Sequence, residues 1–219
     1  MIELTLKALL AYALGNVMGG HLVGRLRGVD LARVGSGNIG ATNALRTQGS
    51  GFALLVLAID VCKGVVGALA VPLLPLGEVL GSGLETVDRS VQAFVCGAAV
   101  TVGHCYPAAW RFQGGKGVAT LAGVFGAVLP WSLPWVLGGF VLVVLLSGYV
   151  SLATLGATAL AGLYVACVDA RGALSAAGAF TAFMGTLVVF KHRDNIRRLR
   201  AGTESRFEKL RVLGRWLDR

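Results

Sequence analysis

The stretch "FALLVLAIDVCKGVVGALAVPLL", residues 52–74, decides the fold, because its only charged residues are Asp60 and Lys63. A run of roughly 20 apolar residues is long enough to cross the hydrocarbon core of a bilayer as an α-helix. The whole chain has the same character, with 55% hydrophobic residues, 14% charged residues and a mean hydropathy of +0.73 over 219 residues. The sequence therefore predicts an all-α, polytopic integral membrane helical bundle.

Six further apolar blocks resemble this stretch, and we interpret each as a membrane span. They are Leu4–Val23, Val91–Gly103, Val118–Leu129, Pro134–Leu146, Leu152–Val168 and Leu174–Phe190. Several are shorter than a full span, so they are expected to extend into their flanks, to tilt or to thin the membrane. We predict seven transmembrane helices. The alternative is five, in which the blocks on either side of Pro130 and Pro134 fuse and another is dropped.

The distribution of basic residues predicts the orientation. Half of the 20 lysines and arginines lie in the last 29 positions, from Lys191 to Arg219. Six more lie in two other polar segments: Arg25, Arg27, Arg33, Arg46, Arg111 and Lys116. Because cationic loops stay in the cytoplasm, we expect a cytoplasmic C-terminus and an external N-terminus. Segments 24–51, 105–117, 147–151 and 191–219 would then be cytoplasmic, and the acidic segment 75–90 external. The net charge of +9 thus indicates membrane topology and not nucleic-acid binding.

The first polar segment, "VGSGNIGATNALRTQG" at 34–49, contains the G-x-G-x-x-G pattern of dinucleotide-binding folds. That fold needs a preceding strand and a βαβ unit, and here membrane spans lie on both sides, so the nucleotide reading fails. Glycine turns can still direct backbone N–H groups at an anion. We therefore predict a phosphate site made by Ser36, Gly37, Asn38, Gly40, Thr42, Asn43 and Arg46. The alternative is a flexible loop with a helix cap at Asn38 or Thr42.

The second polar segment, "GHCYPAAWRFQGGKGVAT" at 103–120, resembles part of a P-loop, but Gly117 stands where that motif has Ser or Thr. A glycine turn, one lysine and a helix beginning at "VAT" can present N–H groups and an ammonium to a second phosphate. We predict that Gly114, Gly115 and Lys116 form this site. His104 is interpreted as structural more readily than as catalytic.

The third polar segment, 191–219, places His192 and Asn195 three residues apart, on one helix face below the last span. A neutral imidazole and an amide suit recognition of a hydroxyl group. From Arg206 onward we expect a basic amphipathic tail lying against anionic lipid headgroups.

Three residues inside or beside the spans are open to two readings. Asp60 and Lys63 can form an intramembrane ion pair that either supports a site or contacts its ligand. Ser151, at the turn "GYVSLAT", is either a helix cap or a polar group of the site.

Four motifs together resemble those of the bacterial acyl-phosphate:glycerol-3-phosphate acyltransferases of the PlsY type. They are "SGNIGATNALR", "DVCKG", "GHCYPAAWRFQGGKGVAT" and "KHRDNIRRLRAGTE", in this order and over nearly the whole chain. The resemblance implies an acyltransferase domain over residues 1–204, followed by the tail at 205–219. It also implies a multi-pass protein of the bacterial inner membrane, with its active site at the cytoplasmic face.

The implied reaction transfers an acyl group from acyl phosphate to the sn-1 hydroxyl of glycerol 3-phosphate, giving lysophosphatidic acid and inorganic phosphate. Arg46, Lys116, His192 and Asn195 are the catalytic candidates, and Ser151 joins the substrate-binding residues. No covalent enzyme intermediate is required, because an acyl phosphate is already activated. No cofactor is expected, and no metal is expected because the cytoplasmic segments contain only Asp30, Asp194 and the acids of the tail, not a carboxylate cluster. Either the leaving phosphate or His192 takes the hydroxyl proton. Membrane lipids and the enzyme that makes the acyl phosphate are the candidate partners.

Other classes fit the sequence less well. No histidine is followed five residues later by aspartate, as acyl-CoA acyltransferases with an HxxxxD motif require, and no GxSxG elbow is present. A transporter for phosphate esters is the competing class. It would place its polar groups near the membrane midplane and often shows an internal repeat, neither of which the sequence indicates.

Overall fold

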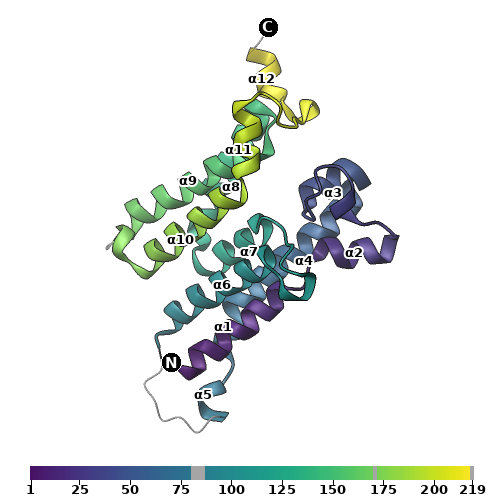
Figure 1. Cartoon of the computed structure of the whole chain (residues 1–219). Helices are drawn as coiled ribbons and strands as arrows, with labels where there is room; N and C mark the ends of the chain where they lie inside the picture. The colour runs from purple at the N-terminus through teal and green to yellow at the C-terminus, as the bar shows by residue number, and fades with distance from the viewer. Residues whose placement is uncertain (80–86, 170–171, 218–219) are drawn as a thin grey trace. The chain divides into compact units, whose positions relative to one another are not determined.

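The computed structural model describes residues 1–79, 87–169 and 172–217, and over these residues it contains helices, turns and loops but no strand (Figure 1). The chain divides into two compact units, Met1–Pro130 and Trp131–Arg219, and we describe each by itself. The all-helical prediction is confirmed for the described residues.

The first unit is built around α4. Its α-helices are α1 (Ile2–Gly15), α2 (Gly19–Arg27), α3 (Ala41–Gln48), α4 (Ser50–Leu69), α5 (Leu76–Val79), α6 (Arg89–Cys105) and α7 (Val118–Val128). Short 3₁₀ turns lie at Leu31–Arg33, Val71–Leu73 and Ala108–Trp110. α4 packs against α7, α6, α3 and α2, and α1 packs along α6.

Small residues allow these helices to approach closely. A Cβ atom on Gly64 of α4 would lie 2.1 Å from the carbonyl oxygen of Thr120 on α7. One on Gly15 of α1 would lie 2.3 Å from the carbonyl oxygen of Val100 on α6. Backbone contact at glycine is how helices associate in lipid, where apolar burial provides little driving force.

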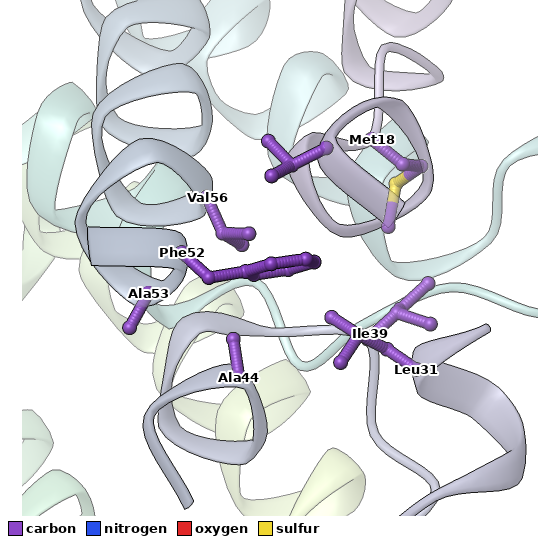
Figure 2. Packing of buried hydrophobic residues seen from close by; sticks show 8 residues of the cluster. Met18, Leu31, Ile39, Ala44, Phe52, Ala53 and Val56 are labelled. Atoms are coloured by element: carbon purple, nitrogen blue, oxygen red, sulfur yellow. The ribbon is translucent and has the colours of Figure 1, made fainter. Parts of the chain in front are cut away.

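An apolar cluster at one end of the first unit holds the first polar segment in place (Figure 2). Its buried residues are Met18, Val23, Leu31, Ile39, Ala44, Phe52, Ala53 and Val56. They come from the start of α2, the loop before α3, α3 itself and the start of α4. The phosphate-site candidates therefore lie on a loop anchored on both sides by packed side chains.

The second unit contains α8 (Leu133–Ser147), α9 (Val150–Val168), α10 (Ala176–Lys191), α11 (Arg193–Arg200) and α12 (Val212–Leu217). The 3₁₀ turn Pro130–Ser132 precedes α8, and two more lie at Gly172–Leu174 and Glu208–Leu210. α9 packs between α8 and α10, and α12 packs against α8. Gly148 closes the turn between α8 and α9 with φ +74°, a conformation that favours glycine.

Each predicted apolar block is helical, but the first is not one continuous helix. α1 ends at Gly15 and α2 begins at Gly19, so the block at Leu4–Val23 is broken in its middle. Four segments are long and apolar enough to cross a membrane: Ile2–Arg27, Ser50–Leu73, Pro130–Ser147 and Val150–Val168. Val118–Val128 and Ala176–Lys191 are apolar but shorter. The seven-span count and the orientation stay predictions. Residues 80–86 of the predicted external segment 75–90 lie outside the described residues, as do residues 170–171.

Candidate active site

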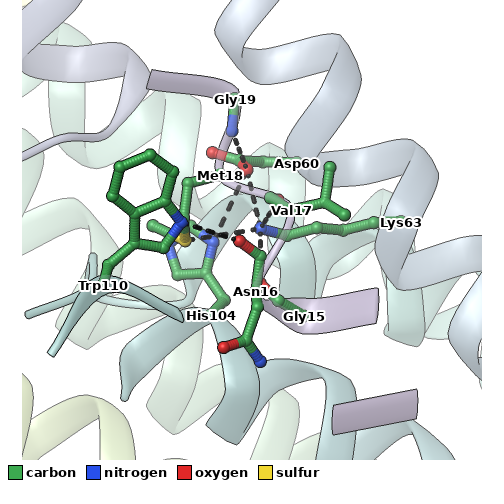
Figure 3. Close-up of polar contacts among 9 residues, drawn as sticks. All are labelled: Gly15, Asn16, Val17, Met18, Gly19, Asp60, Lys63, His104 and Trp110. Atoms are coloured by element: carbon green, nitrogen blue, oxygen red, sulfur yellow. Dashed lines mark hydrogen bonds and ion pairs between the residues drawn. The ribbon is translucent and has the colours of Figure 1, made fainter. Parts of the chain in front are cut away.

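The break between α1 and α2 is held by the ion pair Asp60–Lys63 of α4 (Figure 3). Lys63 Nζ donates to the carbonyl oxygens of Gly15 at 3.2 Å and Val17 at 2.7 Å, and it lies 2.9 Å from Asp60 Oδ1. The backbone N–H of Gly19, at the start of α2, donates to the same Asp60 oxygen at 3.2 Å. Helix ends leave backbone groups without partners, and inside a membrane no bulk water can satisfy them. The pair therefore acts as a cap for both broken ends, as a supporting role requires, and its contact with a ligand stays the alternative.

His104 connects this ion pair to the second polar segment. Its Nδ1 atom lies 3.5 Å from Asp60 Oδ1, and its backbone carbonyl accepts a hydrogen bond from Gly115 N at 3.1 Å. A Cβ atom on Gly115 would lie 2.2 Å from His104 Nε2. The buried imidazole is thus packed between Asp60 and the glycine turn, as the structural reading of this histidine predicts.

The end of α1 also holds the second segment. Asn16 Oδ1 accepts from Ala109 N at 3.0 Å, and the Asn16 carbonyl accepts from Trp110 Nε1 at 3.1 Å. The Tyr12 hydroxyl donates to the Tyr106 carbonyl at 2.7 Å. The loop before Lys116 is therefore fixed to the helix break by side chains of α1.

In the first segment, Asn43 shapes the loop that precedes it. Its Oδ1 accepts from Ser36 N at 2.9 Å, and its Nδ2 donates to the carbonyls of Leu31 at 3.1 Å and Val34 at 2.9 Å. The side chain is buried, and Gly35, with φ +59°, passes so close that a Cβ there would lie 2.3 Å from Asn43 Oδ1. The loop conformation thus depends on one amide and one glycine.

The remaining candidates of this segment surround the start of α3. Gly40 is the N-cap residue and no side chain caps the helix, so the alternative of a cap at Asn38 or Thr42 is wrong. Ser36 and Gly37 are exposed, whereas Asn38, Gly40 and Thr42 are half-buried. Arg46 is exposed on the last turn of α3. The predicted arrangement of a glycine loop followed by a helix start is confirmed.

The second segment also has its predicted form. Gly117, with φ +81°, is the N-cap of α7, which begins at Val118. Gly115 is buried, and Gly114 and Lys116 are half-buried. A glycine turn and one lysine therefore stand directly before a helix, as expected for an anion site.

A cavity of about 730 Å³ joins the two segments, with Gly37 of the first and Gly114 of the second in its wall. Arg46 and Lys116 are not among the described residues that line it. Sequence reasoning missed most of its polar and aromatic residues: His21, Arg25, Asp30, Trp110, Arg111 and Gln113.

An aromatic and basic stack forms one side of this cavity. The His21 and Trp110 rings stack with centroids 3.9 Å apart and planes at 19°, and the Arg25 guanidinium lies 4.7 Å from the Trp110 ring centroid. The sequence indicates only a topological role for Arg25 and Arg111. Both line the cavity together with Trp110, and this meeting of segments distant in the chain leaves no local signal in the sequence.

In the second unit, the Glu204 carboxylate accepts hydrogen bonds from three side chains: Asn195 and Arg198 of the third polar segment and Ser151 at the start of α9. Its Oε1 accepts from Ser151 Oγ at 2.8 Å and Asn195 Nδ2 at 2.6 Å, and its Oε2 accepts from Arg198 Nε at 2.7 Å. Burial raises the pKa of this carboxyl, but the hydrogen bonds from Asn195, Ser151 and Arg198 outweigh it and hold the pKa below the usual value.

One of the two readings of Ser151 is thereby decided. Ser151 is not a helix cap, because Tyr149 is the N-cap residue of α9 and no side chain caps it. Ser151 is buried in the first turn of α9 and shares the Glu204 carboxylate with Asn195, and its place in the substrate site stays a prediction. Glu204 itself was overlooked as one acid among many basic residues.

His192 lies at the junction of α10 and α11 and is buried, as is Asn195. Its Nδ1 lies 2.8 Å from the Val188 carbonyl oxygen, which can only accept, so Nδ1 carries the hydrogen. In the neutral imidazole Nε2 is then the acceptor. This is the protonation state that a base or a hydroxyl acceptor needs.

Known proteins resemble this chain over most of its length. A model of the family described as glycerol-3-phosphate acyltransferase matches residues 5–202. The glycerol-3-phosphate acyltransferase of Geotalea daltonii is 40% identical over 199 residues, covering 91% of this chain and 95% of that protein. That of Aquifex aeolicus is 39% identical, covering 90% and 95%.

The crystal structure of PlsY, an integral membrane glycerol 3-phosphate acyltransferase, is also similar. Its glycerol 3-phosphate form has a TM-score of 0.80 at 36% identity, and the alignment covers 96% of this chain and 98% of PlsY. Its lysophosphatidic acid form has a TM-score of 0.78 at 35% identity. The protein is therefore a multi-pass membrane acyltransferase, and the chain belongs to the glycerol-3-phosphate acyltransferase family.

Proposed function

We propose that this acyltransferase takes its acyl group from acyl phosphate and transfers it to the sn-1 hydroxyl of glycerol 3-phosphate. The products are lysophosphatidic acid and inorganic phosphate. The related PlsY was crystallised with glycerol 3-phosphate and in a lysophosphatidic acid form, which supports this acceptor and this product. The observation that carries the proposal is the cavity into which both glycine segments open, because each segment has the form of a phosphate site.

Phosphate binding is assigned to the first unit. The loop of Ser36 to Gly40 precedes the N-terminus of α3, and the turn of Gly114 to Lys116 precedes α7, so both present backbone dipoles of favourable sign. Arg46 and Lys116 add positive charge. Asn43 acts by shaping the first loop, because its amide already makes three hydrogen bonds there.

Hydroxyl recognition is assigned to Ser151, His192 and Asn195. Glu204 fixes the Ser151 hydroxyl and the Asn195 amide in one arrangement, so these groups need little reorganisation when substrate binds. His192 offers Nε2 as an acceptor.

In the chemical step, the sn-1 oxygen attacks the acyl carbonyl carbon and forms the ester bond. The bond between that carbon and the phosphate oxygen breaks, and inorganic phosphate leaves with its electron pair. The hydroxyl proton goes to the leaving phosphate, with His192 as the rival acceptor. Positioning of two anions and neutralisation of their charge supply the catalysis.

We also propose seven spans, an external N-terminus and an active site at the cytoplasmic face of the bacterial inner membrane, with residues 205–219 as a separate tail. Half of the lysines and arginines lie in the last 29 positions, which supports this orientation.

The test is phosphate release by the purified protein from palmitoyl phosphate, with and without glycerol 3-phosphate, and with palmitoyl-CoA as the rival donor. We expect release that depends on glycerol 3-phosphate and is matched by lysophosphatidic acid. No reaction with palmitoyl phosphate, together with turnover of palmitoyl-CoA by the same folded sample, would overturn the assigned donor.

A further inference from the structure

The tail after Glu204 is fastened to the turn between α8 and α9. Arg206 Nε donates to the Ser147 carbonyl at 2.7 Å, and Phe207 N donates to the Gly148 carbonyl at 2.9 Å. The Arg206 guanidinium lies 5.1 Å from the centroid of the Tyr149 ring. Through its backbone and the Arg206 side chain, the tail thus contacts three consecutive residues, Ser147, Gly148 and Tyr149. The tail therefore has a fixed starting point.

The helix of the tail, α12, is fixed at the end of a candidate span. Gly214 packs so closely on α8 that a Cβ there would lie 2.1 Å from the carbonyl oxygen of Leu146. Leu146 belongs to the last turn of α8, and Pro130–Ser147 is apolar and long enough to cross a membrane. α12 therefore packs on the C-terminal end of this candidate span.

The exposed residues of the tail from 206 to 217 are mostly apolar or cationic. They are Glu208, Lys209, Leu210, Val212, Leu213, Arg215, Trp216 and Leu217, and the one acid among them, Glu208, is paired with Arg206 at 3.4 Å. Trp216 is 71% exposed and Leu217 is 64% exposed, which is unusual for such large apolar side chains in water. Tryptophan is enriched at membrane interfaces, where one part of the ring contacts hydrocarbon and the other contacts water.

We propose that residues 206–217 form an interfacial surface that binds the anionic headgroups of the surrounding bilayer. The cations attract lipid phosphate groups, and the tryptophan and leucine side chains enter the boundary between headgroups and acyl chains. A protein partner would not require the surface to stand at the end of a span, whereas a bilayer is necessarily present there. The family match ends at residue 202, so the surface lies outside the region that this chain shares with its family model.

The experiment measures the environment of Trp216 in the full-length protein. The protein is placed in nanodiscs of brominated phosphatidylcholine, with or without phosphatidylglycerol, because bromine quenches a tryptophan that reaches the acyl chains. The difference between the parent protein and its Trp216→Phe variant isolates the signal of this residue. We expect stronger quenching when phosphatidylglycerol is present.

Charge is tested with a matched pair of variants. Each basic residue near an anionic surface contributes about 1 kcal/mol, so the double variant Lys209→Gln and Arg215→Gln should weaken docking by about thirtyfold and remove the effect of phosphatidylglycerol. The double variant Lys209→Arg and Arg215→Lys keeps both charges and should behave like the parent. Equal Trp216 quenching in both kinds of nanodisc, or an unchanged response in the glutamine variant, would overturn the proposal and turn attention to an acidic protein partner.

Discussion

Two carboxylates organise the two units of this protein, and they do so under different conditions. Asp60 receives Lys63 Nζ and Gly19 N and lies next to His104, inside α4 and with its side chain only 1% exposed. Glu204 receives Ser151, Asn195 and Arg198 in the loop after α11; its side chain is 7% exposed, and its partner Arg198 is 42% exposed. Each carboxylate therefore joins three groups and is itself buried, but only Glu204 has a partner that reaches solvent.

The different surroundings of Asp60 and Glu204 indicate which carboxylate mainly stabilises the fold and which mainly orients site residues. Around Asp60 no water can replace a lost partner, so each broken contact leaves a buried polar or charged group. At Glu204 the partner Arg198 reaches solvent, so its charge stays hydrated when the contact is lost, and the loss mainly releases the side chains that the carboxylate orients. The first carboxylate should therefore be needed for folding, and the second for activity.

The largest expected effect comes from breaking the buried pair. Asp60→Asn leaves the Lys63 charge without its counter-ion and should destabilise the protein by about 3–5 kcal/mol, measured as unfolding in detergent. Removing both charges, with Asp60→Asn and Lys63→Met together, should recover part of this loss. An Asp60→Asn protein as stable as the parent would show that the two carboxylates do not differ in this way.

The next effect concerns activity at Glu204. Hydrogen bonds to charged groups contribute about 1.5–3 kcal/mol, so Glu204→Gln should lower kcat/KM for glycerol 3-phosphate by roughly 10- to 100-fold. The unfolding transition should change far less than in Asp60→Asn. A loss of stability equal to that of Asp60→Asn, with normal activity in the surviving fraction, would reverse the assigned roles.

A smaller effect is expected where the Asp60 network contacts the second segment. Gly115→Ala would place a methyl group against His104 Nε2, and such overpacking destabilises by about 1–3 kcal/mol. Because Lys116 follows directly, the KM for a phosphate substrate should rise as well. Gly138→Ala on α8 is the matched control, since no atom lies within 4 Å of the added group. If both variants behave alike, the contact between His104 and the turn has no consequence.

The smallest expected effect is the pH dependence of the Glu204 network. Because its pKa is lower when folded, the network stabilises the protein above the usual carboxyl pKa of 4.5, and this contribution disappears as the pH falls through the folded pKa. The difference in unfolding between the parent and Glu204→Gln should therefore shrink as the medium becomes more acidic. A difference that stays constant down to the lowest accessible pH would mean that the ionised carboxylate does not stabilise the fold.

Much of the architecture could be predicted from sequence, because apolar blocks and glycine turns are local signals. Each apolar block is helical, and α7 begins directly after the Gly114–Gly117 turn. The break after Gly15 could not be predicted, because Leu4–Val23 is mostly apolar, with Lys7 as its only charged residue, and the residues that cap the break are more than 40 positions away. Local hydropathy contains no information about such distant partners.

The candidate site was predictable to the same extent. The loops of the two phosphate segments follow from their glycines. The spacing of His192 and Asn195 predicted one shared helix face, whereas His192 lies at the junction between α10 and α11 and Asn195 lies in α11, and both are buried. Glu204 and the stack of His21 on Trp110 could not be found in this way, since each acquires its role only through a residue distant in the chain. Whether the predicted residues bind substrate stays a prediction that the variants above can test.

The break between α1 and α2 has a consequence for how the protein is made. During synthesis the segment around Asn16 leaves the ribosome well before Lys63 and Asp60, which later satisfy its carbonyl and N–H groups. Until α4 arrives, those groups would have no partner inside the bilayer if the break already existed there. The nascent first span must therefore enter the membrane unbroken or wait at the water interface. The break between α1 and α2 then forms when α4 arrives.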